Sequence, residues 1–191
     1  MTAEKNDLHR YLAHAREALV WKTEGLSEYD LRRPLTGTGT NLLGLVKHLA
    51  IGEAWYFGAV FDRPFVPHLP WWDDDAPEGA DMWATADESR AEILDLYRAA
   101  AAHADETITS LPLDATGHVP WWPQPEVTLH GVLVHVLAET SRHAGHADIL
   151  REQLDGSVGL RQQGTNVADH DERWWRALVA DVEAAARGAS G

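Results

Sequence analysis

Residues 129–154 carry a stripe of side chains at helical spacing, and this stripe most constrains how the chain can fold. Its members recur at steps of three and four residues, namely Val132, Val136, Glu139, His143, His146, Leu150 and Leu154. That period places all of them on one side of an α-helix. Aliphatic residues form both ends of the stripe, whereas a carboxylate and two imidazoles form its centre. We therefore expect a helix whose core-facing side contains three titratable groups.

Three further segments have the same helical period and predict a bundle. Apolar stripes run along residues 4–24, 41–61 and 85–110, which join 129–154 as four long amphipathic helices. Four such helices in one chain favour an all-α four-helix bundle. No segment shows the alternation with a period of two that predicts a strand.

Cap and turn residues predict where the shorter pieces begin and end. Thr85 and Glu88 have the spacing of a capping box, which predicts that the third helix begins there. Residues 27–35 allow at most two helical turns before the chain meets a proline. A short C-terminal helix is expected at 171–186.

The long segment between the second and third helices determines the expected topology. Residues 62–84 contain four prolines and three tryptophans, which favours an ordered crossover over a disordered linker. A helix of ~20 residues spans ~30 Å, and a loop of this length can cross that distance. The second and third helices can then run parallel, in an up-down-down-up order. We expect residues 1–191 to form one domain.

Composition excludes several classes of function. A net charge of −14 opposes binding to nucleic acid and to anionic membranes. No apolar run reaches the ~18 residues of a membrane span, and the N-terminus lacks the pattern of a signal peptide, so we expect a cytoplasmic protein acting on a small molecule. The absence of cysteine excludes disulfides, thiolate ligands and a cysteine nucleophile. Exposed helix faces leave room for a homodimer.

A metal site is the simplest explanation for the titratable centre of the stripe. Glu139 and His143 are four residues apart, so both side chains reach one point beside the helix. His48 lies in the middle of the stripe of the second helix and would add a third ligand. Three such ligands make an open site for Zn²⁺ or a similar divalent ion. A second ligand set, in which His146 replaces Glu139, stays open.

Other residues are candidates for roles around this site. His146 is a candidate acid or base, and Arg142 a candidate contact to an acidic substrate. His135 lies ~12 Å along the helix axis from His143, too far to share one ion with it. Trp72 and Trp122 belong to tryptophan pairs in the two long loops, where they can form the wall of a ligand pocket at the mouth of the bundle.

Two segments carry a resemblance to a known superfamily: "TNLLGLVKHLAIGEAWYFG" (40–58) and "TLHGVLVHVLAETSRHAGHADILREQLDG" (128–156). With the "LPWW" and "VPWW" loops between them, the sequence resembles the DinB/YfiT-like four-helix bundle metalloproteins. It is most similar to their actinobacterial branch of mycothiol-dependent enzymes. The resemblance implies an up-down-down-up bundle that binds zinc, or nickel, through His48, Glu139 and His143. The middle ligand is often histidine in the superfamily, and is glutamate in relatives of mycothiol-dependent maleylpyruvate isomerase.

The resemblance also implies a reaction. Some relatives use a metal-activated low-molecular-weight thiol, such as mycothiol, for transfer to or isomerisation of a small electrophile. Two alternatives stay open, a metal-dependent hydrolase that uses a metal-bound water and a non-catalytic bundle that binds a metal or a small ligand. An open coordination position favours an enzyme, whereas a fourth protein ligand such as His146 favours a structural metal.

Overall fold

A computed structural model shows a mostly helical protein, and it describes residues 1–66, 68–73, 75–163 and 166–189. The α-helices within these residues are α1 (Ala3–Trp21), α2 (Glu28–Arg32), α3 (Leu42–Tyr56), α4 (Arg90–Ser110), α5 (Leu129–Asp155) and α6 (Glu172–Gly188). Short 3-10 helices lie between α3 and α4, namely η1 (Ala59–Phe61), η2 (Pro70–Trp72) and η3 (Ala80–Met82). The predicted long helices are all present, although the second ends at Tyr56 and is followed by η1.

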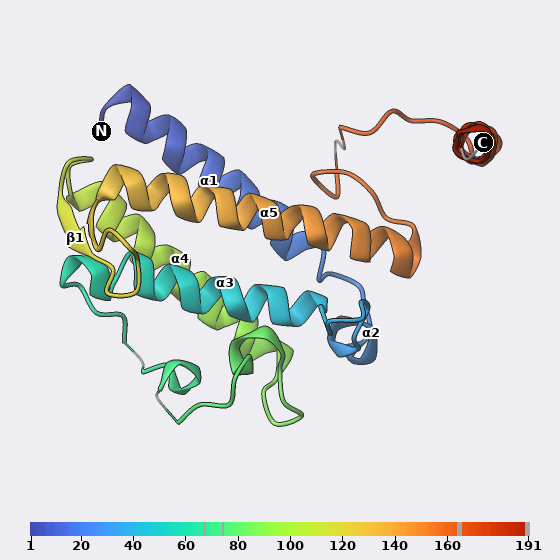
Figure 1. Ribbon diagram of the computed structural model, residues 1–191. Helices are drawn as coiled ribbons and strands as arrows, with labels where there is room; N and C mark the ends of the chain where they lie inside the picture. Colours follow the sequence, from blue (N-terminus) through green and yellow to red (C-terminus); the bar gives the residue numbers. More distant parts are fainter. Residues whose placement is uncertain (67, 74, 164–165, 190–191) are drawn as a thin grey trace.

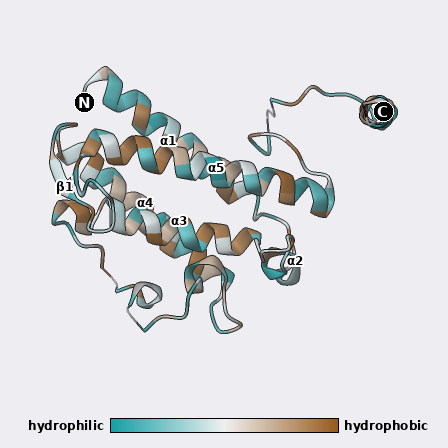
Figure 2. Cartoon of the chain, in the orientation of Figure 1, coloured by the Kyte–Doolittle hydropathy of each residue, from teal (hydrophilic) through white to brown (hydrophobic). Residues whose placement is uncertain are grey.

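Helices α1, α3, α4 and α5 form the body of the molecule. The most extensive packing is between α3 and α4 and between α1 and α5, and α3 also packs against α5 (Figure 1). Each of the four long helices carries hydrophobic and hydrophilic residues side by side (Figure 2). This mixed pattern is expected of helices that bury one side and expose the other.

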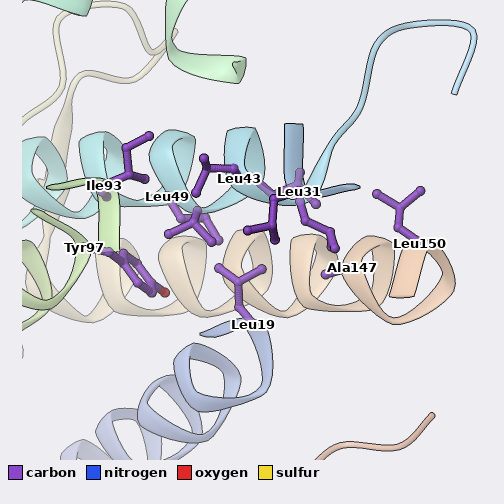
Figure 3. Packing of buried hydrophobic residues seen from close by; sticks show 12 residues of the cluster. Leu19, Leu31, Leu43, Leu49, Ile93, Tyr97, Ala147 and Leu150 are labelled. Atoms are coloured by element: carbon purple, nitrogen blue, oxygen red, sulfur yellow. The ribbon is translucent and has the colours of Figure 1, made fainter. Parts of the chain in front are cut away.

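Two hydrophobic clusters fill the space between these helices. In the first, Leu19, Leu49, Tyr97 and Ala147 come from α1, α3, α4 and α5 and are all at least 96% buried. Figure 3 shows their side chains directed into the space between the helices. The second cluster lies towards the other end of the bundle. Because burying a Leu or Phe side chain contributes about 1.5–3 kcal/mol, the two clusters hold α3 and α5 side by side.

The start of α4 differs from the prediction. The helix begins at Arg90, where Ser89 and Glu92 form the capping box. Glu88 instead accepts a hydrogen bond from the Thr85 backbone and forms an ion pair with Lys47 at 2.8 Å. The Lys47 side chain is buried, and a buried ammonium group is costly unless a carboxylate pairs with it. Glu88 provides that carboxylate, while Ser89 and Glu92 cap α4.

The prediction that the chain has no strands is wrong at one place. Strands β1 (Thr116–His118) and β2 (Glu126–Thr128) pair antiparallel, with Thr116 opposite Thr128. Three residues are too few to show an alternation in the sequence. The hairpin packs closely on η1, since a Cβ at Gly117 would lie 2.7 Å from the Val60 carbonyl oxygen.

The crossover from α3 to α4 packs against the start of α3. Asn41 caps α3 through Gly44, and its amide also donates to the Met82 carbonyl oxygen at 3.3 Å. Lys47 donates to the Trp83 carbonyl oxygen at 3.0 Å. A Cβ at Gly44 would overlap the Met82 carbonyl oxygen. The part of the crossover at Met82 and Trp83 is therefore held against α3.

Helix α6 lies apart from the rest of the bundle in Figure 1 and has no buried residues. Its large apolar side chains are Trp174, Trp175, Leu178, Val179 and Val182. Among the described residues, none of the helices combines the length and apolar character that crossing a membrane requires.

Candidate functional site

His48 of α3 and His143 of α5 face each other across the contact between the two helices. The centroids of their rings are 5.1 Å apart, and the ring planes meet at 71°. His143 Nε2 lies 3.5 Å from Glu139 Oε2, one turn earlier on α5. The fold thus brings the three predicted ligand residues into one neighbourhood, although His48 is far in the sequence from the other two.

The expectation that this part of the stripe faces the core is wrong for Glu139 and His146. The Glu139 side chain is 39% exposed and His146 is exposed, whereas the His143 side chain is only 12% exposed. The buried positions in the middle of α5 are Thr140, Ala144 and Ala147, each one residue after a predicted one. Because an α-helix has 3.6 residues per turn, the predicted stripe and the stripe one residue further along both end among the same aliphatic side chains of α5. The titratable groups therefore occupy the edge of the helix contact.

His146 and Arg142 lie outside this contact. His146 Nδ1 is 3.4 Å from His143 Nδ1, so one imidazole can donate to the other. Arg142 is exposed on the neighbouring face of α5. Neither side chain belongs to the lining of the cavity beside His48.

Asp81 is a functional neighbour that the sequence analysis missed. It lies in η3 of the crossover, and its Oδ2 accepts a hydrogen bond from His48 Nδ1 at 2.6 Å. This bond lowers the pKa of Asp81 below the ordinary value of a carboxyl group. It also fixes the orientation of the ring and leaves His48 Nε2 as the nitrogen that can bind a ligand. In the sequence, Asp81 is distinguished only as an acidic residue of the crossover, and this does not predict a contact with His48.

The electrostatics at His143 favour a neutral imidazole. Burial, followed by the nearby His48 ring, lowers its pKa to about 4. A neutral imidazole is the form that binds metal ions. In the parts of the chain that the structure describes, no three His, Asp or Glu side chains are already arranged as a metal site. The donor types of His48, Glu139 and His143 nevertheless fit a divalent cation.

A cavity of about 570 Å³ opens beside His48 and Glu139. It has the size of a small-molecule site. The lining comes from α3, α5, η3 and the β1–β2 hairpin, namely His48, Leu49, Gly52, Glu53, Tyr56, Asp81, Trp121, His135, Val136 and Glu139. His135, which is too far along α5 to share an ion with His143, thus lines the cavity, as do Gly52 and Glu53, for which no role was predicted.

Glu53 connects this cavity to a buried ion pair. Its Oε1 accepts a hydrogen bond from Arg16 Nε of α1 at 2.9 Å, and Arg16 Nη1 donates to Asp105 of α4 at 2.7 Å. Burial raises the pKa of Glu53, and the Arg16 guanidinium opposes that rise. This network ties three helices together beneath the cavity.

The two tryptophans of the β1–β2 loop differ in their position relative to the cavity. Trp121 lines the cavity, whereas Trp122 packs behind it, with its ring 4.7 Å from His135 and 5.9 Å from Tyr56. The side chain of Trp72 lies outside the described part of the structure. Trp121 therefore lines the cavity, whereas the sequence predicted its neighbour Trp122.

Fold and site together describe a mostly helical protein with a cavity of about 570 Å³ at an edge where imidazoles and a carboxylate meet. The mycothiol-S-transferase family model matches residues 7–156. The chain belongs to this family, which agrees with the resemblance to DinB-like, mycothiol-related proteins. The match ends where α5 ends, so α6 lies beyond it. A comparison with curated proteins finds no match.

Proposed function

We propose that this protein is a metal-dependent transferase that joins a low-molecular-weight thiol of the mycothiol type to a small electrophile. Membership of the mycothiol-S-transferase family supports the thiol and the transfer. The single observation that supports a metal site is the proximity of His48 and His143, whose ring centroids are 5.1 Å apart, with Glu139 beside them.

In this proposal His48, Glu139 and His143 hold the cation. When bound, such a cation would supply Lewis acidity that lowers the pKa of a thiol beside it and favours the thiolate at neutral pH. His48 would bind through Nε2, because Nδ1 is engaged with Asp81. Glu139 is half-exposed and can turn towards His143, from which its carboxylate is 3.5 Å away. The chain has no cysteine, so the thiol comes from outside.

The cavity would hold the reactants next to these residues. Its lining residues include both His48 and Glu139, so a molecule bound there touches two of the three proposed ligands. His146 stays our proposal for proton transfer, since it contacts His143 at 3.4 Å from the solvent side. Arg142 has no place at the cavity, and we propose no contact between it and the electrophile.

The test combines metal content with thiol transfer. We expect wild-type protein to bind one equivalent of Zn²⁺ or Ni²⁺ in a calorimetric titration and to conjugate a chromogenic electrophile only when mycothiol is present. His48→Ala and Glu139→Ala should lose both properties and keep the helical circular dichroism spectrum. His130→Ala is the matched control, since His130 is an exposed histidine near the start of α5.

Two outcomes would contradict the proposal. Turnover of an ester or amide without any thiol would favour a metal-dependent hydrolase. Equal metal binding by wild type and by both variants would remove His48, Glu139 and His143 from the metal site.

We also propose the up-down-down-up order and a single domain. The pairing of α1 with α5 and of α3 with α4, and the long crossover between α3 and α4, support both.

A further inference from the structure

A glycine in the middle of α3 faces the cavity beside His48. Gly52 lies one turn after His48 and one turn before Tyr56, and all three residues line the cavity. A Cβ at this position would meet no atom within 4 Å. Glycine in a helix interior costs about 1 kcal/mol relative to alanine, and here no packing against a neighbour requires it. The missing side chain leaves open space between His48 and Tyr56.

Aromatic rings line the same cavity as the open position at Gly52. Tyr56 lies 4.9 Å from His135 and 6.3 Å from Trp121, measured between ring centroids. Trp121 is itself held by Trp55, with centroids 4.0 Å apart. Rings that are fixed by neighbouring rings lose little conformational freedom when a ligand binds. This aromatic wall is thus pre-organised for contact with a flat apolar group, and half-exposed Trp121 is accessible to it.

In the absence of a bound cation, the charges around the cavity favour an uncharged ligand. Among the residues that the structure describes, the lining includes no lysine or arginine. The carboxylates of Glu53 and Asp81 are engaged by Arg16 and by His48. Glu139 makes only the longer contact with His143. An anion would meet carboxylates without a free cation, and a cation would find two of the three carboxylates already paired.

We infer that the cavity bounded by Gly52, Tyr56, Trp121 and His135 binds an uncharged, planar aromatic group of the thiol acceptor. The identification of the ligand as the thiol acceptor rests on the proposed function, because thiol transfer requires an electrophile as the second substrate. The binding site itself rests only on the open position at Gly52, the fixed rings and the charges described above. Planar aromatic rings gain free energy from offset or edge-to-face contacts beyond the burial of their area.

Direct binding tests this inference without thiol or metal. Calorimetric titrations would compare naphthalene-2-methanol with its carboxylate and methylammonium analogues and with cyclohexylmethanol. We expect naphthalene-2-methanol to bind at least tenfold more tightly than each of the other three. Tighter binding of the carboxylate, the ammonium or the cyclohexyl compound would overturn the inference.

Substitutions place the ligand. Gly52→Leu fills the open position and is expected to weaken naphthalene-2-methanol binding at least tenfold, while thermal unfolding shows no loss of stability. Gly145→Leu is the matched control, since Gly145 is also in a helix, also has open space at its Cβ and lies outside the cavity. Trp121→Ala should reduce the preference for the aromatic over the cyclohexyl compound. Unchanged binding in Gly52→Leu would overturn the assignment.

The two proposals fail separately. Aromatic binding that Gly52→Leu abolishes, without any thiol transfer, supports this site and contradicts the proposed function. Thiol transfer that Gly52→Leu leaves unchanged, without aromatic binding, supports the proposed function and contradicts this site.

Discussion

Asp81 and His48 form a hydrogen bond of 2.6 Å that joins the crossover to the site on α3. The two residues are 33 positions apart in the sequence. The bond occupies Nδ1 of His48 and so leaves Nε2 as the nitrogen that can bind a ligand. The long crossover therefore contributes a side chain to the candidate site as well as connecting two helices.

Removal of this carboxylate should weaken metal binding. Second-shell partners of metal-bound histidines typically change metal affinity about 10- to 100-fold, so we expect a loss of that size in Asp81→Ala. Isothermal titration with Zn²⁺ measures it. Asp75→Ala, another acidic residue of the crossover, should bind as wild type does. Unchanged affinity in Asp81→Ala would show that His48 does not need this partner.

Gly44→Ala should destabilise the protein. The new Cβ would overlap the Met82 carbonyl oxygen, which is backbone and cannot turn aside, so the crossover must move. We expect the free energy of unfolding to fall by about 1–3 kcal/mol, as for overpacked sites in general. Urea denaturation followed by circular dichroism measures the change.

Gly145→Ala is the matched comparison for Gly44→Ala. A Cβ at Gly145 meets nothing within 4 Å, and alanine is the better helix former by about 1 kcal/mol. The variant should therefore be as stable as wild type or more so. A similar loss in both variants would mean that the contact with Met82 is not the cause.

The buried pair of Arg16 and Glu53 should show strong coupling. Arg16→Met leaves the Glu53 carboxylate buried without its main partner, which typically costs about 3–5 kcal/mol. The double variant Arg16→Met, Glu53→Leu should recover most of that loss, because no buried charge stays unpaired. Asp105 also loses Arg16, but its side chain is 42% exposed and keeps the contact with His9 at 2.8 Å. A double-mutant cycle from urea denaturation tests the coupling. Additive effects of the two substitutions would contradict it.

Asp155 should make stability depend on pH in the acid range. Burial alone would raise its pKa, but hydrogen bonds from Arg151 and Ser157 lower it below the ordinary 3.8. A lowered carboxyl pKa contributes stability above pH 3.8, and this contribution is lost as the pH falls through the lowered value. Thermal unfolding at pH 5 and pH 2.5 should therefore differ less in Asp155→Asn than in wild type. Glu152→Gln, with its side chain exposed one turn from residue 155, should behave as wild type does.

The candidate site was partly predictable from local spacing. The i, i+4 pair of Glu139 and His143 and the central position of His48 need only the helical period, and the structure brings these three residues together. Their exposure was not predictable, because neighbouring stripes of α5 share the same apolar ends. Only packing against α1 and α3 selects Thr140, Ala144 and Ala147 as the buried side. Asp81, Glu53 and Trp121 join the site through long-range contacts that no local pattern encodes.

The sequence by itself determined the helical elements, the long ordered crossover and the residue types that could meet between the second and fourth long helices. Each of these depends on interactions within a few residues, where periodicity and caps are informative. The tertiary structure alone decided the start of α4, the β1–β2 hairpin and the cavity. Each of these depends on distant partners. Glu88 pairs with Lys47 while Ser89 and Glu92 cap α4. The short hairpin packs on η1, and the open position at Gly52 becomes part of a cavity only when Tyr56, His135 and Trp121 surround it.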